Sequence, residues 1–464
     1  MLPAMTAALT ALPHAPGRIP LLGDVASVDR HKPTQKEAEL ATSLGPIFQR
    51  LLLGDRLVLV AGGELANLCN DEERWARGLA GPGAKLRTIA GSGLFTARTS
   101  DPHWGQARRI LNPGFTQAAL RLYHDAMSGV ADDLEIAWTA GDGPIDVHTA
   151  MTAVTLEVIA RAGFSRSMGL FEGSNPVGDK FVAALARTLS WASESTNDIP
   201  LLGIVRSLLQ TRRLNSDVSF VRDYVDSIIS QRRTDGSNAS DLLSLMLSTK
   251  DPESGASLPD DNVRDQVLTF LVAGHETTAA LLEVALYYLA SNPDYADRIR
   301  NEATARGGFD YDDITGMRWT RQFLNECLRL WPPVPGYFRV SRTSQDLGGY
   351  EVPGGQAVFV LSLAAQRDPA VWGDNADQFA PERFSPENLR AFPQRFFGPW
   401  GSGPRSCIGR AFALQESVLV LSRIVTAFEL RLAPGSGPLD MRERGTLRPA
   451  SYYLEVAKID KEDQ

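Results

Sequence analysis

A long apolar stretch near the middle of the chain limits the folds open to it. Residues 262–290 read as one helix, and Asn292-Pro293 marks its end. At about 1.5 Å per residue, this helix spans on the order of 40 Å, the diameter of a domain. Because it is apolar on most faces, we expect it to run through the core. The polar loop before it predicts an N-cap at Asp260 or Asp261.

The rest of the periodicity is mostly helical, with a few short strand-like runs. From about 103 to 345, apolar residues recur at helical spacing. We therefore predict a mainly α protein with small β-sheets. No linker separates independent cores, so 1–464 is predicted as one domain, with 1–35 as an extended lead-in. The other expected elements are a hairpin at 51–60 turning at Gly54-Asp55, helices at 149–162, 217–232 and 240–249, and strands at 357–363 and 452–456.

Cysteine spacing and charge exclude several classes of protein. The three cysteines, Cys69, Cys327 and Cys407, form no C-x-x-C pair, which excludes a four-cysteine zinc or iron–sulfur site and indicates a reducing compartment. The net charge of −8 argues against binding to nucleic acid or an anionic membrane. Residues 1–12 form neither a membrane span nor a convincing signal peptide, so we expect a cytoplasmic protein.

A glycine-rich loop delivers one cysteine to the start of an apolar helical run. Glycines at 401, 403 and 409 allow sharp turns and close approach to a flat ligand, with Arg405 and Cys407 between them. The free N–H groups at a helix start favour a thiolate, and a thiolate can serve as the axial ligand of a haem iron. The alternative is a buried structural cysteine, the usual fate of a free cysteine.

Inside the long helix, Ala273-Gly274-His275-Glu276-Thr277 places an acid beside a threonine in apolar surroundings. A threonine hydroxyl can bond back to the carbonyl four residues earlier and bend the helix, and Gly274 leaves room beside it. One interpretation is a helix kink with satisfied polar groups. The other is an oxygen-binding notch with a proton relay. His275 is expected to be a packed or solvent-facing neighbour.

Two further pairs have helical spacing. Glu326 and Arg329 lie three apart, as an ordinary surface ion pair would, and Arg383 follows later. Trp104 and Arg108 lie four apart on a helix expected to start near His103. They are either amphipathic surface residues or two groups that reach one ligand.

Together these segments resemble the cytochrome P-450 monooxygenases from about residue 45 to 456, and most closely the haem domains of bacterial self-sufficient fatty-acid hydroxylases. The resemblance implies the cytochrome P-450 fold, with the long helix crossing a haem b. It implies that Cys407 is the iron ligand, that Thr277 stabilises bound dioxygen, and that Glu276 brings protons. It assigns Trp104, Arg108, Arg405, Gly401, Ala273 and Gly274 to the haem, Phe95, Ala90, Leu86, Val334 and Ala273 to the substrate, and Glu326, Arg329 and Arg383 to a buried charged network.

The implied function is insertion of one oxygen atom of O2 into a C–H bond of a small apolar substrate, with a fatty acid as one candidate. Where the fatty-acid hydroxylases hold the carboxylate with Arg and Tyr, this chain has Asp55 and Leu59, and Arg56 would have to substitute. A second departure is Trp400, where the family has Phe. Because no reductase domain follows, electrons are expected from an external ferredoxin or flavodoxin with its reductase. The alternatives are a hydroxylase or epoxidase of a neutral terpenoid, steroid or polyketide-like molecule, a peroxygenase, or a haem sensor.

Overall fold

The computed structural model describes residues 7–171, 175–194, 200–236, 239–391 and 396–460. The chain divides into two compact units, and each is described by itself. The strand-rich unit comprises 1–80, 325–407 and 441–447, and the helical unit comprises 81–324, 408–440 and 448–464. The single domain predicted from the sequence stays a prediction.

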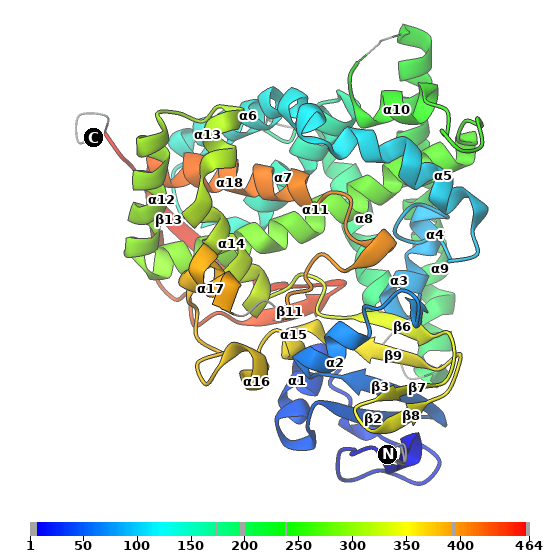
Figure 1. Cartoon of the computed structure of the whole chain (residues 1–464). Coiled ribbons are helices and arrows are strands. Elements are labelled where there is room, and N and C mark those ends of the chain that lie inside the picture. Colours follow the sequence, from blue (N-terminus) through cyan, green and yellow to red (C-terminus); the bar gives the residue numbers. More distant parts are fainter. Residues whose placement is uncertain (1–6, 172–174, 195–199, 237–238, 392–395, 461–464) are drawn as a thin grey trace. The chain divides into compact units, whose positions relative to one another are not determined.

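The strand-rich unit is built on a five-stranded sheet in the order β2-β3-β9-β6-β4. Figure 1 shows strands from the blue start of the chain beside yellow strands from much later in the sequence. The predicted hairpin forms, but it turns at Leu53-Gly54, one residue earlier than expected, with φ of +52° and +95°. Positive φ at both central residues is what a tight two-residue hairpin turn requires. The strands are β2 (Ile47–Leu52), β3 (Asp55–Val60), β4 (Trp75–Arg77), β6 (Tyr337–Ser341) and β9 (Ala357–Val360).

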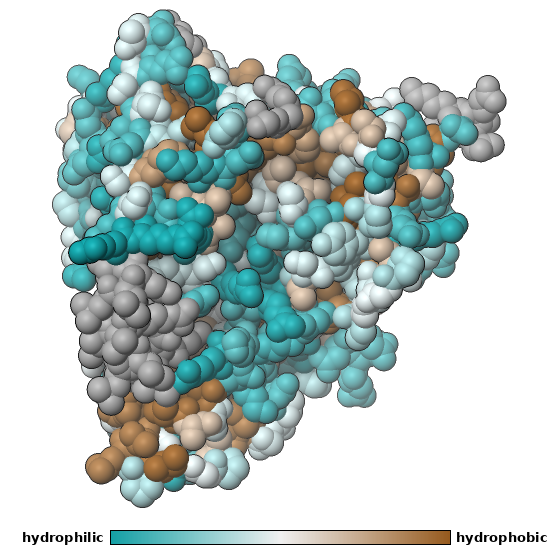
Figure 2. Space-filling view, turned by 180° about the vertical axis from the view of Figure 1, so that it is seen from behind, coloured by the Kyte–Doolittle hydropathy of each residue, from teal (hydrophilic) through white to brown (hydrophobic). Residues whose placement is uncertain are grey.

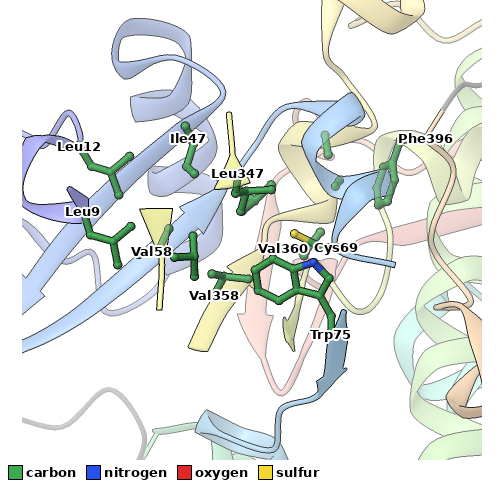
Figure 3. Packing of buried hydrophobic residues seen from close by; sticks show 14 residues of the cluster. Leu9, Leu12, Ile47, Val58, Cys69, Trp75, Leu347, Val358, Val360 and Phe396 are labelled. Carbon is green, nitrogen blue, oxygen red and sulfur yellow. The ribbon is translucent and has the colours of Figure 1, made fainter. Parts of the chain in front are cut away.

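One face of this sheet packs into an apolar core. Val58 and Val60 on β3 point to the same side, as residues two apart must, and join Trp75 and Cys69 in one buried cluster (Figure 3). Phe396 belongs to the same cluster. The other elements of this unit are β1 (Ala7–Ala8), β7 (Gln345–Leu347), β8 (Tyr350–Val352), β11 (Met441–Arg444), α1 (Pro33–Leu44), α2 (Gly63–Leu68), α15 (Ser362–Ala365), α16 (Pro369–Trp372) and α17 (Pro386–Ala391).

The helical unit is organised around α11 (Asp260–Ser291), which packs along α7 (Val147–Phe164). The long predicted helix is confirmed. Its N-cap is Pro259 rather than an aspartate, and both aspartates lie in the first turn, where the helix dipole favours negative charge. Among the described residues, α11 alone is long and apolar enough to span a membrane, and 78% of its apolar window is buried, as expected of a core helix.

Other helices match the sequence expectation with shifted ends. The expected helix at 217–232 lies within α9 (Pro200–Asp235), and the one at 240–249 is α10 (Leu242–Ser248). The remaining elements of this unit are α3 (Gly81–Lys85), α4 (Arg87–Ala90), α5 (Pro102–Leu111), α6 (Gln117–Ala140), α8 (Pro176–Glu194), α12 (Pro293–Arg306), α13 (Tyr311–Gly316) and α18 (Arg410–Ala427), with the sheet β10-β13-β5 (Phe428–Leu432, Tyr453–Lys458, Ile145–Asp146). Two elements, α14 (Arg318–Leu330) and β12 (Thr446–Pro449), contribute residues to both units.

The face shown in Figure 2 is mostly polar, with apolar side chains gathered in patches. The exposed large hydrophobic residues include Leu21 and Leu53, both with positive φ, and Phe95 and Val334. Two of these four, Phe95 and Val334, are residues that the sequence assigned to substrate.

Candidate functional site

The predicted ligand loop runs from Trp400 towards α18. Gly401 and Gly403 have φ of +65° and +63°, the left-handed region that favours glycine, whereas Gly409 at −84° does not use that freedom. The Cys407 amide donates to the Trp400 carbonyl at 2.8 Å, which closes the loop. Helix α18 begins three residues after Cys407 in the chain.

Cys407 differs from the other two cysteines in exposure. It is exposed, while Cys69 and Cys327 are buried. Burial raises the pKa of the Cys69 thiol to about 12 and that of Cys327 well above its usual value, so both stay protonated and are poor metal ligands. The Trp400 indole N–H and the Ser402 hydroxyl are buried without a hydrogen-bond partner among the described residues. An exposed cysteine, on a loop with buried polar groups at Trp400 and Ser402 that have no partner among the described residues, fits a haem ligand.

A chain of hydrogen bonds braces this loop from behind. The buried Gln366 amide donates to the carbonyls of Leu328 and Arg329, at 3.0 and 2.9 Å. Its oxygen accepts from the Gly398 N–H at 2.9 Å, and the Gly398 carbonyl accepts from the Gly401 N–H at 3.1 Å. The start of the cysteine loop is therefore tied to the end of α14.

The residues of the predicted charged network meet in the core of the strand-rich unit. Arg329 donates to both carboxylate oxygens of Glu326, at 2.7 and 2.8 Å, and both side chains are fully buried. Arg383 lies 3.4 Å from the same carboxylate, which also accepts the Ala380 N–H at 2.8 Å. The remaining donors of the two arginines reach the carbonyls of Gln366, Ala376, Gln378, Trp372 and Asn375. The surface ion pair left open by the sequence is thus excluded.

On α11, four predicted residues lie on one accessible side of a buried helix. Ala273, Gly274, Glu276 and Thr277, hereafter the notch, are half-buried, while the turns before and after them are largely buried. Spacings of three and four bring Ala273, Glu276 and Thr277 onto one face. The Thr277 hydroxyl donates to the Ala273 carbonyl at 2.7 Å, the predicted bond to the residue four earlier.

The far side of the notch is packed against α7. His275 is buried, its Nδ1 bonds to the Leu271 carbonyl, and its own carbonyl accepts from the Thr155 hydroxyl at 3.0 Å. Burial lowers the pKa of His275 to about 4, so the ring is neutral near pH 7. A Cβ on Gly274 would lie 3.4 Å from Ile159, an ordinary contact distance, so Gly274 also borders α7.

Phe95 lies on the loop between α4 and α5. Its neighbours Leu94 and Thr96 are buried, yet Phe95 is 39% exposed. The Arg87 guanidinium donates to the Thr96 carbonyl at 2.7 Å, so the backbone beside Phe95 is held in place. The other residues assigned to substrate are Ala90, which is buried, Leu86 and Ala273, which are half-buried, and Val334, which is 41% exposed.

The residues assigned to the haem periphery are half-buried cations and an indole. Trp104 and Arg108 lie one turn apart on α5, whose N-terminus is capped by the Asp101 side chain accepting the His103 N–H at 3.0 Å. Arg405 ends the short 3-10 turn that precedes the cysteine. Two guanidinium groups and an indole N–H are the kinds of donor that bind an anionic group.

The strand geometry overturns the suggested role of Arg56. Residue register pairs Leu52 with Asp55, and side chains alternate along β3. Asp55 and Leu59 therefore share one face, and Arg56 points to the opposite face, with the core residue Val58. Arg56 does not supply a cation beside Asp55 and Leu59.

Three polar residues that the sequence did not single out support the Phe95 loop. Asn262, Asp265 and Gln266 lie in the first turns of α11 and bond to the loop backbone at Ser92 and Leu94. Their only local signal is polarity at spacings of three and four on an otherwise apolar helix.

Comparison with known proteins gives the family. The family model described as cytochrome P450 matches residues 13–456. A bifunctional cytochrome P450/NADPH–P450 reductase of Bacillus cereus is 36% identical over 94% of this chain and 41% of its own length. A self-sufficient cytochrome P450 monooxygenase, CYP505E3, of Phanerodontia chrysosporium is 34% identical over 97% of this chain and 43% of its own. The chain thus spans less than half of these curated relatives.

The fold matches as well. A solved crystal structure of a cytochrome P450 (CYP102L1) superposes with a TM-score of 0.88 at 36% identity, covering 97% of this chain and 99% of that one. The predicted fold class and the predicted enzyme class, a cytochrome P450 monooxygenase, are confirmed by these matches, and the family implies a haem-iron cofactor. This chain therefore belongs to the cytochrome P450 family, as its sequence resemblance predicted.

Proposed function

We propose that the protein inserts one oxygen atom of O2 into a C–H bond of a small apolar substrate. The observation that carries this proposal is Cys407. It is the exposed cysteine of the three, at the end of a loop with two glycines of positive φ and ahead of a long helix. This is the setting in which a thiolate binds haem iron.

The cofactor we propose is haem b, with the Cys407 sulfur as axial ligand. Arg405, Arg108 and the Trp104 indole would donate to its propionates. The Trp400 indole N–H, buried without a partner among the described residues, would donate towards the thiolate. When bound, the haem supplies O2 binding and O–O bond cleavage, and the thiolate favours that cleavage.

The chain's own part in the reaction is to hold and move protons. The Thr277 hydroxyl now donates to the Ala273 carbonyl at 2.7 Å and can turn to donate to a ligand on the accessible side of the notch. We assign the proton supply to the Glu276 carboxylate, which lies half-buried on the same side. Protonated peroxide needs no such supply, so an acid and a hydroxyl at this place favour O2 over the peroxygenase alternative.

Among substrate classes, the strand-rich unit favours a neutral molecule. Asp55, Leu57 and Leu59 share the face of β3 that would meet a substrate carboxylate. The charged residue on this face is Asp55, an anion. A fatty acid placed there would meet repulsion, while a neutral terpenoid, steroid or polyketide-like molecule would not. Phe95, Ala90, Leu86, Val334 and Ala273 would supply an apolar lining.

Electrons would come from NAD(P)H through a ferredoxin or flavodoxin and its reductase. We place the protein in the cytoplasm, which agrees with three cysteines that form no C-x-x-C pair and a net charge of −8.

Three measurements on the haem-loaded chain test this function. First, the reduced CO complex should show a thiolate-type Soret band that Cys407→Ser abolishes and Cys69→Ser preserves. If Cys407→Ser keeps that band, the ligand assignment is wrong.

Second, dodecanol and dodecanoic acid, which share one chain length, are each titrated into the protein while the haem spin state is followed. A shift with the alcohol and not with the acid supports a neutral substrate, and the reverse overturns that choice. Incorporation of label from ¹⁸O2 with a surrogate ferredoxin and reductase separates an enzyme from a sensor.

A further inference from the structure

The loop that carries Phe95 is held to α11 by three side chains. The Ser92 N–H donates to an Asp265 oxygen at 2.7 Å, and the Ser92 carbonyl accepts from the Asn262 amide at 3.2 Å. The Leu94 N–H donates to the Gln266 oxygen at 2.9 Å. The Gln266 amide then donates to the Asn262 oxygen at 3.0 Å, which fixes both side chains. Asn262 and Gln266 are buried. We call these three residues the clamp.

Two glycines let the loop backbone lie directly on the helix. Gly91 has φ of +47°, and a Cβ on it would lie 2.1 Å from an Asp265 oxygen. A Cβ on Gly93 would lie 1.8 Å from the Thr269 hydroxyl oxygen. Real Cβ atoms do not approach so closely, so the loop position depends on glycine at both places.

The clamp lies on the same side of α11 as the notch. Asn262, Gln266 and Ala273 follow one another at spacings of four and seven, so at 100° per residue they lie within about 40° of one another on one helical face. The loop therefore docks on the two turns that precede the notch: Gln266 lies about two turns before Ala273, and Thr269, which faces Gly93, lies about one turn before it. Phe95 is the side chain this loop leaves accessible, between two buried neighbours.

We propose that Asn262, Asp265 and Gln266 are positioning residues for ligand specificity. They hold the backbone that presents Phe95, and so set which ligand shapes fit beside the notch. The inference rests on the proposed haem function. If Gln266 lost its oxygen, the buried Leu94 N–H would be left without an acceptor, so the loop would move to reach another one or water. That movement would leave the affinity for a small ligand unchanged, whereas it would alter the affinity for a bulky one.

The test uses the haem-loaded full chain and two iron-binding probes, imidazole and 4-phenylimidazole. The dissociation constant of each is measured from the Soret shift. Gln266→Leu removes the acceptor at similar size, and Gln266→Glu keeps an oxygen for the Leu94 N–H. Phe95→Ala reports whether this side chain contacts the bulky probe. The matched control is Gln49→Leu, because Gln49 is equally buried but donates to the carbonyls of Thr10 and Leu12.

For Gln266→Leu we expect the dissociation constant of 4-phenylimidazole to change by about fivefold or more. The dissociation constant of imidazole should change by less than about twofold. A tenfold change equals about 1.4 kcal/mol. In Gln266→Glu the 4-phenylimidazole dissociation constant should lie within about twofold of the parent value. In Gln49→Leu this constant should equal the parent value. If Gln266→Leu does not fold, Asp265→Ala against Asp265→Asn poses the same question at a half-buried position.

Three results would overturn the inference. The first is an unchanged 4-phenylimidazole constant in Gln266→Leu when Phe95→Ala alters it. The second is Gln266→Glu behaving like Gln266→Leu. The third is Phe95→Ala leaving both probes unchanged, which would remove Phe95 from the ligand site while the haem proposal stood. If instead the parent shows no Soret shift with either probe, the proposed function itself fails.

Discussion

Removing the charge of Glu326 should destabilise the fold far more than its sequence spacing suggests. Its carboxylate accepts from Arg329 at 2.7 and 2.8 Å and from the Ala380 N–H, and Arg383 lies 3.4 Å away. In Glu326→Gln the side chain keeps its size but retains one acceptor oxygen. Two buried guanidinium groups then lack a counter-charge.

The expected cost is about 3–5 kcal/mol of unfolding free energy, the usual penalty for breaking a fully buried ion pair by removing one partner. That corresponds to an increase of about 100- to 4,000-fold in the unfolding equilibrium constant. Domains have about 5–15 kcal/mol of stability, so the variant should still fold, but with a markedly lower urea midpoint.

The chain contains a matched control for this experiment. Lys36 and Glu39 on α1 also lie three residues apart, with side chains 43% and 68% exposed. Glu39→Gln should cost less than about 1 kcal/mol, because water screens the pair. Urea unfolding followed by circular dichroism compares both variants with the parent. Equal midpoints for Glu326→Gln and Glu39→Gln would refute the argument that burial makes this network stabilising.

Three further outcomes are expected. Thr277→Ala should lower product formed per electron pair by about tenfold while NAD(P)H oxidation continues, because the proton donor at the notch is lost and the helix is kept; unchanged coupling would contradict this role. The pKa of His275 is lowered by burial from 6.5 to about 4, so as pH falls from 6.5 to 4 the unfolded chain takes up a proton that the folded chain does not. Stability should therefore decline over that window, by up to about 3 kcal/mol more than in His275→Gln, as pH-dependent urea midpoints would show. Gly403→Ala should reduce the thiolate-type CO complex, because φ is +63° and the new Cβ would lie 2.5 Å from a Glu72 oxygen, whereas Gly437→Ala, with nothing within 4 Å, should not.

Sequence periodicity was enough to predict elements whose stabilising contacts are local. The long helix α11 was predicted because its apolar residues and its terminal Asn292-Pro293 lie in one stretch. Its cap was wrong because Pro259 holds the extended conformation that the aspartates were expected to supply. The hairpin turn was wrong by one residue because the strand register, which packing of β3 sets, places Leu53 rather than Asp55 in the turn.

Candidate site residues with a characteristic motif could be proposed from sequence, whereas the residues that hold them in place could not. Cys407 and Thr277 lie in short recognisable segments. By contrast, Gln366 bonds to Gly398, and Asn262 bonds to Ser92 across 170 positions of sequence. Only the folded chain brings such partners together. The direction of Arg56 could have been found from strand alternation alone, since Val58 and Val60 mark the core face.

The docking of the Phe95 loop separates what can vary in this chain from what cannot. Gly91 and Gly93 lie so close to α11 that a Cβ on either one would force the loop or its partners on the helix to move. Phe95, by contrast, contributes an accessible ring to a backbone held by its neighbours. A library of variants at position 95 would therefore sample new pocket shapes on one unchanged scaffold, whereas the same library at position 91 or 93 would mostly yield misfolded loops. Substitution of Phe95, by selection or in the laboratory, is therefore the change at this loop that disturbs the backbone least.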